Sequence, residues 1–545
     1  MNDADRSSIA QQPNAAEQRG TVLALLHRLR AQHPAAAMSL IETHISFVLL
    51  ARPLAYKIKK AIKLAFLDFT TLAQRRFYCD EELRLNRRLA PALYLDVLPV
   101  TGPPEQPAFG GAGPVIDWAL RMHAFAQDDL WDRLAARGAL HAGHIDELVE
   151  TLAAFHEQAA VAAATDPCGQ AAQVRAPVQA TLRALAALCT TSADRARLVE
   201  LARREAEAFD ALQPVFDERL QGGHVRECHG DLHLGNVTLV DGRTTLFDCL
   251  EFDPALRWTD VMSDVAFMAM DLQAHRLPYL AHRFVNGYVE RSGDHSGLHL
   301  LRYHALYRAL VRARVAALRT AQLGKPAPAA QGQDSAITPG RYLDTALICS
   351  RPDRPTLLLT HGPSGSGKTL ATQSLLECCG AIRIRADVER KSLFGLPALA
   401  HSGSALKAGL YSAAATEATH ARLLARAEQV LGCGYSVILD ATFLAQQPRD
   451  AARALAARLG VGFVIIDFQA SVDTLRRRVQ ARALRDDDSS EADLAVLEDQ
   501  LASAQPLRPH EQAEAFVFDA EPVFDPAVAL ARWAGLLRRM GPAQA

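Results

Sequence analysis

The stretch GPSGSGKT at residues 362–369 constrains the fold of this chain more than any other feature. An apolar run, TLLLTHG (356–362), precedes it, and a helical pattern, TLATQSLLECC (369–379), follows it. Glycines in such a turn let successive backbone N–H groups point inward, and the start of the helix adds partial positive charge. The pattern therefore predicts a strand, a phosphate-binding loop and a helix, the opening unit of an α/β fold with a buried parallel sheet.

Further strand-like runs alternate with helical periods along the rest of the chain, as in a doubly wound α/β sheet. They are AIRIRAD (381–387), SVILDATF (436–443), GFVIIDFQA (462–470) and EAFVFDA (514–520). We therefore expect a P-loop domain that has a parallel sheet with helices on both faces.

The glycine-rich loop predicts an ATP site of the Walker A type. Lys368 would reach the β- and γ-phosphates, and the hydroxyl of Thr369 would bind Mg²⁺. Asp440 ends a strand-like run and predicts a second magnesium ligand; no Glu follows it, which favours transfer to a substrate over ATP-driven motor work. The predicted ATP-binding residues of the loop are Gly362, Pro363, Ser364, Gly365, Ser366, Gly367, Lys368 and Thr369.

Acceptor-side groups are predicted at the end of the next strand. Asp387 should emerge at the carboxyl edge of the sheet, where open α/β folds bind ligands. A carboxylate there can accept a proton from an attacking hydroxyl, although an Asp in that place can also cap a helix. Arg390 and Lys391, about one helical turn later, could hold an anionic group of the acceptor.

Residues 473–500 predict a lid. Arg478 and Arg482 lie at i and i+4 on one helical face, and Arg485 follows just beyond. Such arginines can close over phosphates and stabilise transferring charge. A solvated basic face, balanced by the acidic residues 486–488, is the alternative.

A second constellation, CHGDLHLGN at 228–236, lies more than a hundred residues upstream. Asn236 follows Asp231 by five residues, and Asp248 comes twelve residues further on, at the end of the run TTLF. One Asp near the acceptor hydroxyl, followed by an Asn and a second Asp on magnesium, is the arrangement of eukaryotic-type kinases. A polar turn in a structural hairpin is the alternative.

The lysine of this second ATP site should lie on the strand LAYKIKK (54–60). Lys57 fits because Ala55, on the same strand face, leaves room for adenine. Lys59 points the same way and remains open, as does a plain surface strand of lysines. Glu82, in a helix-like segment, is the candidate partner that holds the lysine.

The C-terminal part resembles the P-loop kinase-like family of AAA-type ATP-binding proteins, akin to polynucleotide kinases, zeta toxins and small-metabolite kinases. The resemblance rests on the Walker loop, the D-V-x-R-K strand end, VILDAT and the arginine-rich lid. It implies that Asp387 is the general base, that Arg390 clamps a phosphate of the acceptor and that Arg482 is the lid arginine, for which Arg478 and Arg485 compete.

The N-terminal part resembles the aminoglycoside phosphotransferase and choline kinase superfamily. With THIS, YKIKK, EELRLNRRLA, HGDLHLGN and DVMSDVAFMAMDL, the whole tandem resembles the bifunctional aminoglycoside phosphotransferase/ATP-binding proteins of bacteria. The resemblance implies Asp231 as catalytic base and Asn236 and Asp248 as Mg²⁺ ligands. No feature of the sequence indicates an acidic pocket that would suit a polycationic antibiotic, so the resemblance does not imply drug resistance.

We therefore expect an N-terminal protein-kinase-like fold of the α+β type followed by the α/β P-loop domain. The expected segments are a disordered tail (1–20), a kinase-like domain (21–323), a linker (324–340) and the P-loop domain (341–545). Nine cysteines without a C-x-x-C pair, and no apolar run near the ~20 residues that span a bilayer, predict a cytoplasmic protein without a membrane partner.

The sequence thus predicts an ATP-dependent phosphotransferase with two sites that use ATP and Mg²⁺, each acting on a hydroxyl group. One catalytic domain with a regulatory ATP-binding partner, and an ATP-switched interaction protein, are the alternatives. We expect a small anionic acceptor. The net charge of −2 argues against long nucleic acid, while a short 5′-hydroxyl end stays open. Neither the acceptors nor the oligomeric state can be predicted from the sequence.

Overall fold

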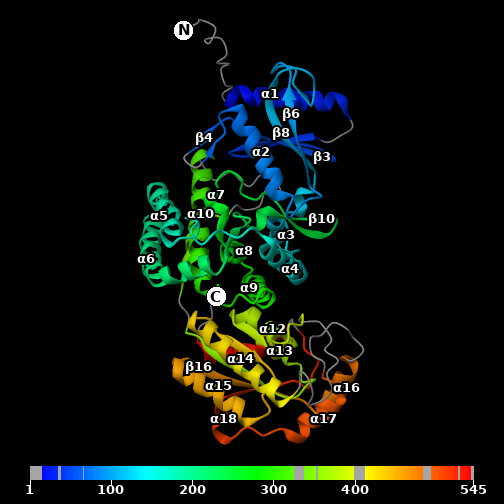
Figure 1. The fold of residues 1–545 in the computed structure, drawn as a ribbon, viewed down its shortest axis with the longest axis vertical. Helices are drawn as coiled ribbons and strands as arrows, with labels where there is room; N and C mark the ends of the chain where they lie inside the picture. The colour runs from blue at the N-terminus through cyan, green and yellow to red at the C-terminus, as the bar shows by residue number, and fades with distance from the viewer. Residues whose placement is uncertain are drawn as a thin grey trace. The chain divides into compact units, whose positions relative to one another are not determined.

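A computed structural model describes residues 15–34, 38–64, 67–323, 337–351, 354–397, 412–482, 492–525 and 528–541 (Figure 1). These residues form two compact units. The first contains the residues up to Pro177 together with Phe216–Met268, and the second contains Val178–Val215, residues 269–323 and the residues from Ile337 onward. Helices before the predicted linker therefore pack with the P-loop part of the chain.

The boundaries of the linker are only partly described. Residues 324–336 lie outside the described residues, whereas Pro339 and Gly340 already belong to the helix α11 (Pro339–Cys349). The predicted domain limits of 21–323 and 341–545 stay predictions.

An antiparallel sheet opens the first unit, with strand order β1-β2-β3-β8-β6-β7. Alternating side chains of β2 and β3, including Phe47, Leu49 and Ile58, form a buried cluster with residues of the first helix. The elements are α1 (Ala15–Gln32), β1 (Met38–Glu42), β2 (Ser46–Ala51), β3 (Leu54–Lys59), β4 (Lys63–Leu64), β5 (Leu67–Asp68), α2 (Leu72–Asn86), β6 (Tyr94–Thr101), β7 (Ala108–Phe109) and β8 (Val115–His123).

The predicted disordered tail of residues 1–20 extends too far, because α1 already begins at Ala15. Gln18 anchors this helix: its Nε2 donates to Lys59 O and to Asp117 Oδ2, each at 2.7 Å. The polar composition of the stretch indicated disorder, but these tertiary contacts order its last residues. Residues 1–14 lie outside the described residues.

Helices and two small two-stranded sheets, β10-β11 and β12-β9, follow, and they carry the second constellation. The strands β10 and β11 pair antiparallel directly after the loop that contains Asp231. The elements are α3 (Trp131–Ala136), α4 (Ala142–Gln158), α5 (Ala171–Leu188), α6 (Ser192–Gln221), β9 (Val225–Glu227), β10 (Val237–Val240), β11 (Arg243–Leu246), α7 (Pro254–Arg257), β12 (Trp258–Asp260) and α8 (Val261–Ala274), with 3₁₀ turns at Gln127–Asp129 and Leu234–Asn236.

In the second unit, a five-stranded parallel sheet has the order β14-β15-β13-β16-β17, and it confirms the predicted α/β fold of the P-loop part. The P-loop strand β13 lies in the middle, so its carboxyl end opens between two neighbours. The elements are α9 (Pro278–Ser292), α10 (Leu298–Leu323), β13 (Thr356–His361), α12 (Lys368–Cys379), β14 (Ile382–Arg385), α13 (Ala386–Leu393), α14 (Ala413–Gly432), β15 (Val437–Asp440), α15 (Gln446–Leu459), β16 (Gly462–Gln469), α16 (Val472–Arg482), α17 (Leu494–Ser503), α18 (Pro509–Glu514), β17 (Ala515–Asp519) and α19 (Ala529–Met540).

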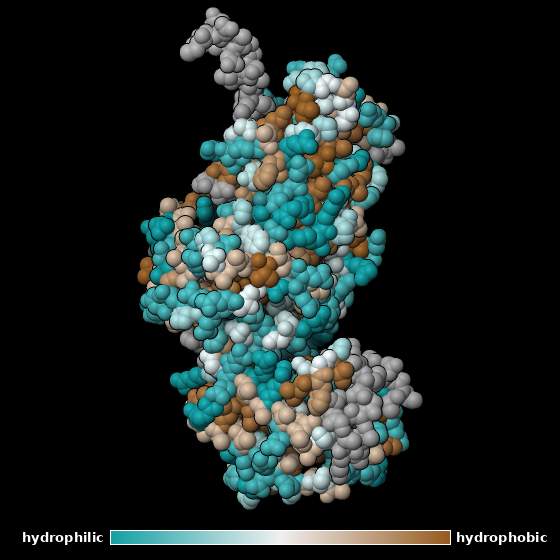
Figure 2. Space-filling model, in the orientation of Figure 1, coloured by the Kyte–Doolittle hydropathy of each residue, from teal (hydrophilic) through white to brown (hydrophobic). Residues whose placement is uncertain are grey.

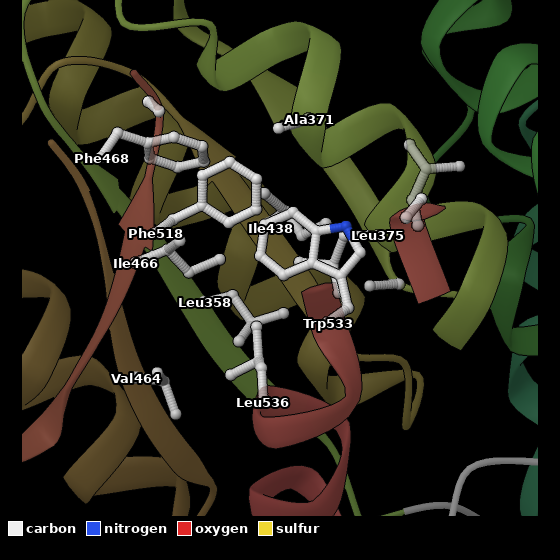
Figure 3. Packing of buried hydrophobic residues seen from close by; sticks show 14 residues of the cluster. Leu358, Ala371, Leu375, Ile438, Val464, Ile466, Phe468, Phe518, Trp533 and Leu536 are labelled. Carbon is white, nitrogen blue, oxygen red and sulfur yellow. The ribbon is translucent and has the colours of Figure 1, made fainter. Parts of the chain in front are cut away.

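A buried cluster of aliphatic and aromatic side chains packs on one face of this sheet (Figure 3). Trp533 of α19 stacks on Phe518 of β17 with ring centroids 4.5 Å apart, and its Nε1 donates to Ser374 Oγ at 2.9 Å. Leu375 of α12 belongs to the same buried cluster. The helices α14 and α15 contribute nothing to this cluster and contact each other and the strands, so helices cover both faces of the sheet.

The surface of the chain mixes hydrophilic and hydrophobic residues on the face that Figure 2 shows. Among the described helices, none combines the length and the apolar character needed to cross a bilayer.

Candidate active sites

Two lysines of β3 share one buried carboxylate from α2. The Lys57 Nζ donates to Glu82 Oε1 at 2.7 Å, and the Lys59 Nζ donates to Glu82 Oε2 at 2.6 Å. Both lysines lie on one face of β3 because side chains alternate along a strand. The structure thus brings the predicted lysine into contact with its predicted glutamate.

The second partner of each lysine distinguishes the two. The Lys57 Nζ donates to Asp248 Oδ1 at 2.6 Å, whereas the Lys59 Nζ donates to Glu251 Oε1. The side chain of Lys59 is 1% exposed and that of Lys57 is 12% exposed. Because Lys57 is the lysine beside the predicted metal ligand, these contacts favour it over Lys59 as the phosphate-binding residue.

The charges in this cluster stabilise one another. Burial raises the pKa of Glu82, but the two ammonium groups outweigh burial and hold that pKa at about 2. Burial lowers the pKa of Lys57, but the carboxylates of Asp248 and Glu82 raise it well above its ordinary value. Lys57 and Glu82 therefore keep their charges at neutral pH.

Replacing Glu82 by alanine is expected to lower the free energy of unfolding by about 3 kcal/mol, because two buried ammonium groups lose their shared partner. Asp80→Ala is the matched control on the same helix. Asp80 pairs with Arg76 with both side chains more than half exposed, and such a pair contributes at most about 1 kcal/mol. Urea denaturation followed by circular dichroism measures both variants, and equal losses would contradict the role of the shared carboxylate.

The loops on either side of the β10–β11 hairpin are joined by a backbone hydrogen bond. The Phe247 N–H donates to Asn236 O at 3.0 Å. The Asn236 Nδ2 donates to Asp231 O at 2.8 Å and to Asp231 Oδ2 at 3.0 Å. Because Asp248 directly follows Phe247, the three predicted residues of this site lie on two adjoining loops.

These loops offer the ligand atoms that Mg²⁺ prefers. Asn236 donates both of its bonds through Nδ2, which leaves its Oδ1 as an oxygen ligand. The side chain of Asp248 is 38% exposed and supplies carboxylate oxygens. Hard oxygen donors of this kind fit magnesium, which also keeps several waters.

Sequence reasoning missed two residues that shape this site. The Asp264 carboxylate, fully buried in α8, accepts from the His229 N–H at 2.8 Å and from the Gly230 N–H at 3.0 Å. Asp248 has a left-handed φ of 61°, and its N–H donates to Tyr94 Oη at 3.2 Å. An acidic residue inside an apolar helix is the one signal that pointed to Asp264; nothing in the sequence pointed to Tyr94.

In the second unit, the loop between β13 and α12 takes a conformation that favours glycine. Gly362, Gly365 and Gly367 have φ values of 145°, 83° and 79°. A Cβ added at Gly365 would lie 2.8 Å from the backbone oxygen of Leu475. The glycines of the predicted phosphate-binding loop are therefore required by its backbone.

Lys368 is the first residue of α12, and its side chain reaches back into this loop. Its Nζ donates to two carbonyl oxygens of the loop, each at 2.9 Å. Burial lowers its pKa to about 8, while Asp440 and Asp387 act in the opposite direction and Arg482 lowers it further. The lysine is thus within electrostatic range of three other predicted site residues.

The two predicted magnesium ligands of the P-loop site touch each other. The Thr369 Oγ1 donates to Asp440 Oδ2 at 2.8 Å. The parallel register of β13 and β15 brings Asp440 to the same sheet edge as the loop. A hydroxyl and a carboxylate oxygen at the start of the phosphate-binding helix fit a magnesium ion.

Asp387 and Arg390 also lie close together. Asp387 is in the first turn of α13 and is not its N-cap, which is Arg385. The Arg390 Nη1 lies 3.4 Å from Asp387 Oδ1. Lys391 is 3% exposed, so Arg390 is better placed than Lys391 to meet an acceptor.

The two described lid arginines, Arg478 and Arg482, differ in their contacts. Arg478 donates to backbone carbonyls that follow β17, at 2.8 to 3.3 Å. Arg482 donates to Ala492 O at 2.7 Å and contributes to the lowered pKa of Lys368. Arg485 lies outside the described residues. These contacts favour Arg482 over Arg478.

A glutamine of α17 also holds the phosphate-binding loop, and sequence reasoning missed it. The Ser364 N–H donates to Gln500 Oε1 at 2.8 Å. The helix α17 packs on α16 through Leu475, Val479 and Leu497. Only this packing brings Gln500 to the loop, so no local pattern could have indicated it.

Two family models match this chain, one around each of the two sets of predicted site residues. Residues 78–301 match the model of the phosphotransferase enzyme family, and residues 357–507 match that of an AAA domain. Uncharacterized proteins from Mycobacterium tuberculosis (strain H37Rv) and Mycobacterium bovis are each 33% identical to this chain over 460 residues. The aligned region covers 84% of this chain and 88% of theirs.

Similar solved structures include a gluconokinase from Sinorhizobium meliloti, with 21% identity and a TM-score of 0.25, covering 34% of this chain and 97% of that one. A choline/ethanolamine kinase family protein from Mesorhizobium loti has 13% identity and a TM-score of 0.36, covering 61% of this chain and 99% of that one. Likeness at this level carries no conclusion about a substrate. The two family matches and the mycobacterial relatives show the family: this chain belongs to the proteins that join an aminoglycoside-phosphotransferase-like domain to a P-loop kinase-like domain.

Proposed function

We propose that this protein is an ATP-dependent phosphotransferase with two MgATP sites, each of which transfers the γ-phosphate to a hydroxyl group. The observation that carries the proposal is that each site contains a lysine and three oxygen-bearing side chains, which we assign as two metal ligands and a base. The two sets are Lys57, Asn236, Asp248 and Asp231, and Lys368, Thr369, Asp440 and Asp387. Membership in families of phosphotransferases and P-loop kinases supports phosphoryl transfer.

In the proposed reaction, the acceptor oxygen bonds to the γ-phosphorus while the bond from that phosphorus to the β–γ bridging oxygen breaks. The bridging oxygen keeps the electron pair and leaves with ADP. Asp231 in one site and Asp387 in the other take the proton of the acceptor hydroxyl. The two lysines hold phosphate oxygens. In the P-loop site, Arg482 stabilises the negative charge of the phosphoryl group during its transfer. Bound Mg²⁺ supplies charge neutralisation on the phosphates, and the four oxygen ligands would hold it.

Two alternatives differ in how many sites turn over. In one, a single site is catalytic and the other binds ATP to regulate it; in the other, both sites bind ATP to switch an interaction surface. Catalysis at both sites is favoured because each set includes a candidate carboxylate base in addition to its metal ligands, a group that binding alone does not need.

The proposed acceptor of the P-loop site is a small anionic molecule with a hydroxyl group. Arg390 supports this proposal because it lies beside the base and carries a positive charge. A short nucleic-acid end with a 5′-hydroxyl fits the same chemistry.

The proposed compartment is the cytoplasm. The structure describes all nine cysteines, and none of them is in a disulfide, which supports a reducing environment.

Arg390→Ala is expected to raise the acceptor KM of the P-loop site at least tenfold, because a hydrogen bond to a charged group contributes about 1.5–3 kcal/mol. The KM for ATP should change less, and Asp387→Asn should mainly lower kcat. The measurement is transfer of labelled γ-phosphate by the full chain, carrying Asp231→Asn, to pools of metabolites, nucleotides and 5′-hydroxyl oligonucleotides. Arg458→Ala, which breaks an exposed pair with Glu428, is the control. A cationic or uncharged preferred acceptor would overturn the proposal.

A further inference from the structure

A buried arginine of β14 holds the start of the P-loop helix. The Arg383 Nη1 donates to Thr369 O at 2.8 Å, and its Nη2 donates to Gln373 Oε1 at 2.8 Å. Arg383 is only 6% exposed. The same Thr369 donates its hydroxyl to Asp440, so Arg383 fixes the backbone of a proposed magnesium ligand.

An asparagine of α9 in turn holds the backbone of Arg383. The Asn286 Oδ1 accepts from the Arg383 N–H at 2.7 Å, and Asn286 is 3% exposed. Among the described strands β14 is at the edge of the sheet, so its outward N–H groups have no partner in those strands. The Asn286 side chain therefore takes the place of a neighbouring strand at Arg383. Asp387 lies four residues further along the chain, in the first turn of α13.

Two more residues on the same face of α9 reach the P-loop part of the chain. The Arg283 Nη1 lies 2.6 Å from Glu377 Oε1 of α12, and the Glu290 Oε1 lies 3.4 Å from Arg385 Nη1 of β14. Together with Asn286 they are spaced by three and four residues, which places them along one stripe of the helix. The helix thus contacts α12, which carries Thr369, and β14, the strand that leads directly into α13 and Asp387.

We propose that Asn286 and Arg383 are positioning residues through which α9 sets the metal ligand and the base of the P-loop site. The proposal rests on the proposed function of that site. The helix α9 lies within the region that matches the phosphotransferase enzyme family and outside the AAA domain match. The P-loop site therefore depends on a helix that belongs, by sequence, to the other family.

Magnesium dependence distinguishes positioning from a purely structural role. The parent is the full chain with Asp248→Asn, which removes a proposed metal ligand of the other site. Binding of a non-hydrolysable ATP analogue to this chain is measured at increasing Mg²⁺ concentrations. The same measurement is repeated with a chelator in place of Mg²⁺. Asn286→Leu removes the acceptor at similar size, whereas Asn286→Asp keeps an oxygen acceptor for the Arg383 N–H. Thermal melting checks that each variant folds.

Asn286→Leu is expected to raise the Mg²⁺ concentration for half-maximal binding about tenfold, because it leaves a buried N–H unsatisfied and frees β14. Asn286→Asp should stay within about twofold of the parent, and binding with chelator should be the same in all three chains. A folded Asn286→Leu chain with the parental Mg²⁺ dependence would overturn the proposal.

If Asn286→Leu does not fold, Arg383→Lys decides the question. A lysine keeps the charge but cannot donate to Thr369 O and Gln373 Oε1 in the same planar geometry, so the Mg²⁺ requirement should rise. An unchanged requirement overturns the positioning role. A parent chain that binds no analogue at any Mg²⁺ concentration instead overturns the proposed function of the P-loop site, and the two failures are therefore distinguishable.

Discussion

Asp231→Asn is expected to lower phosphoryl transfer at the N-terminal site by on the order of 10²–10⁴-fold, the scale of losing a general base. Asparagine has nearly the same shape and can still accept the hydrogen bond from the Asn236 Nδ2, but it cannot take the proton of an acceptor hydroxyl. Affinity for MgATP should therefore change little. Turnover and equilibrium binding are measured separately, in a chain whose P-loop site carries Lys368→Ala.

The companion variant Asp248→Asn should behave differently. Asp248 contacts the Lys57 Nζ and is a proposed metal ligand, so its loss should weaken binding that depends on Mg²⁺. Asp253→Asn is the control on the same segment. Asp253 caps α7 by accepting from the Ala255 N–H, a role that asparagine also fills. If Asp231→Asn and Asp248→Asn both lose nucleotide affinity to the same extent, the division between base and metal ligand is wrong.

Lys368→Ala is expected to lower turnover at the P-loop site by on the order of 10²–10³-fold, the usual cost of removing one fixed donor aimed at transition-state charge. Lys368 is the lysine that the loop encloses, with its Nζ held by two loop carbonyls and close to Asp440 and Asp387. Turnover at the N-terminal site should stay normal, which makes that site an internal control. Near-normal turnover at the P-loop site would contradict the assignment of Lys368.

Local sequence patterns predicted much of the P-loop part. The strand-loop-helix pattern around residues 362–369 and the strand that ends at Asp440 both lie where they were expected, because they depend on short apolar runs and glycines. The strand period of two could not choose between Lys57 and Lys59, since both face the same way. Only their distant partners, Asp248 and Glu251, distinguish them.

Long-range polar contacts were beyond prediction. Asp264 accepts hydrogen bonds from the backbone of residues 229–230, and Asn286 accepts one from Arg383, which is 97 residues away in the sequence. A local hydrophobic period cannot predict contacts between residues that are so far apart. The start of α1 was missed for the same reason, because the contacts of Gln18 order a stretch whose composition favours disorder. The sequence motifs predicted phosphoryl transfer, and the tertiary contacts distinguish between candidate residues such as Lys57 and Lys59.

The number of MgATP molecules bound per chain tests the central claim most directly. Equilibrium dialysis of the full chain against a non-hydrolysable ATP analogue with saturating Mg²⁺ is predicted to give two per chain. Asp248→Asn and Lys368→Ala should each reduce the number to one under conditions that saturate only intact sites, and the double variant should bind none. One analogue per wild-type chain, or binding that survives in the double variant, would contradict the account of two MgATP sites.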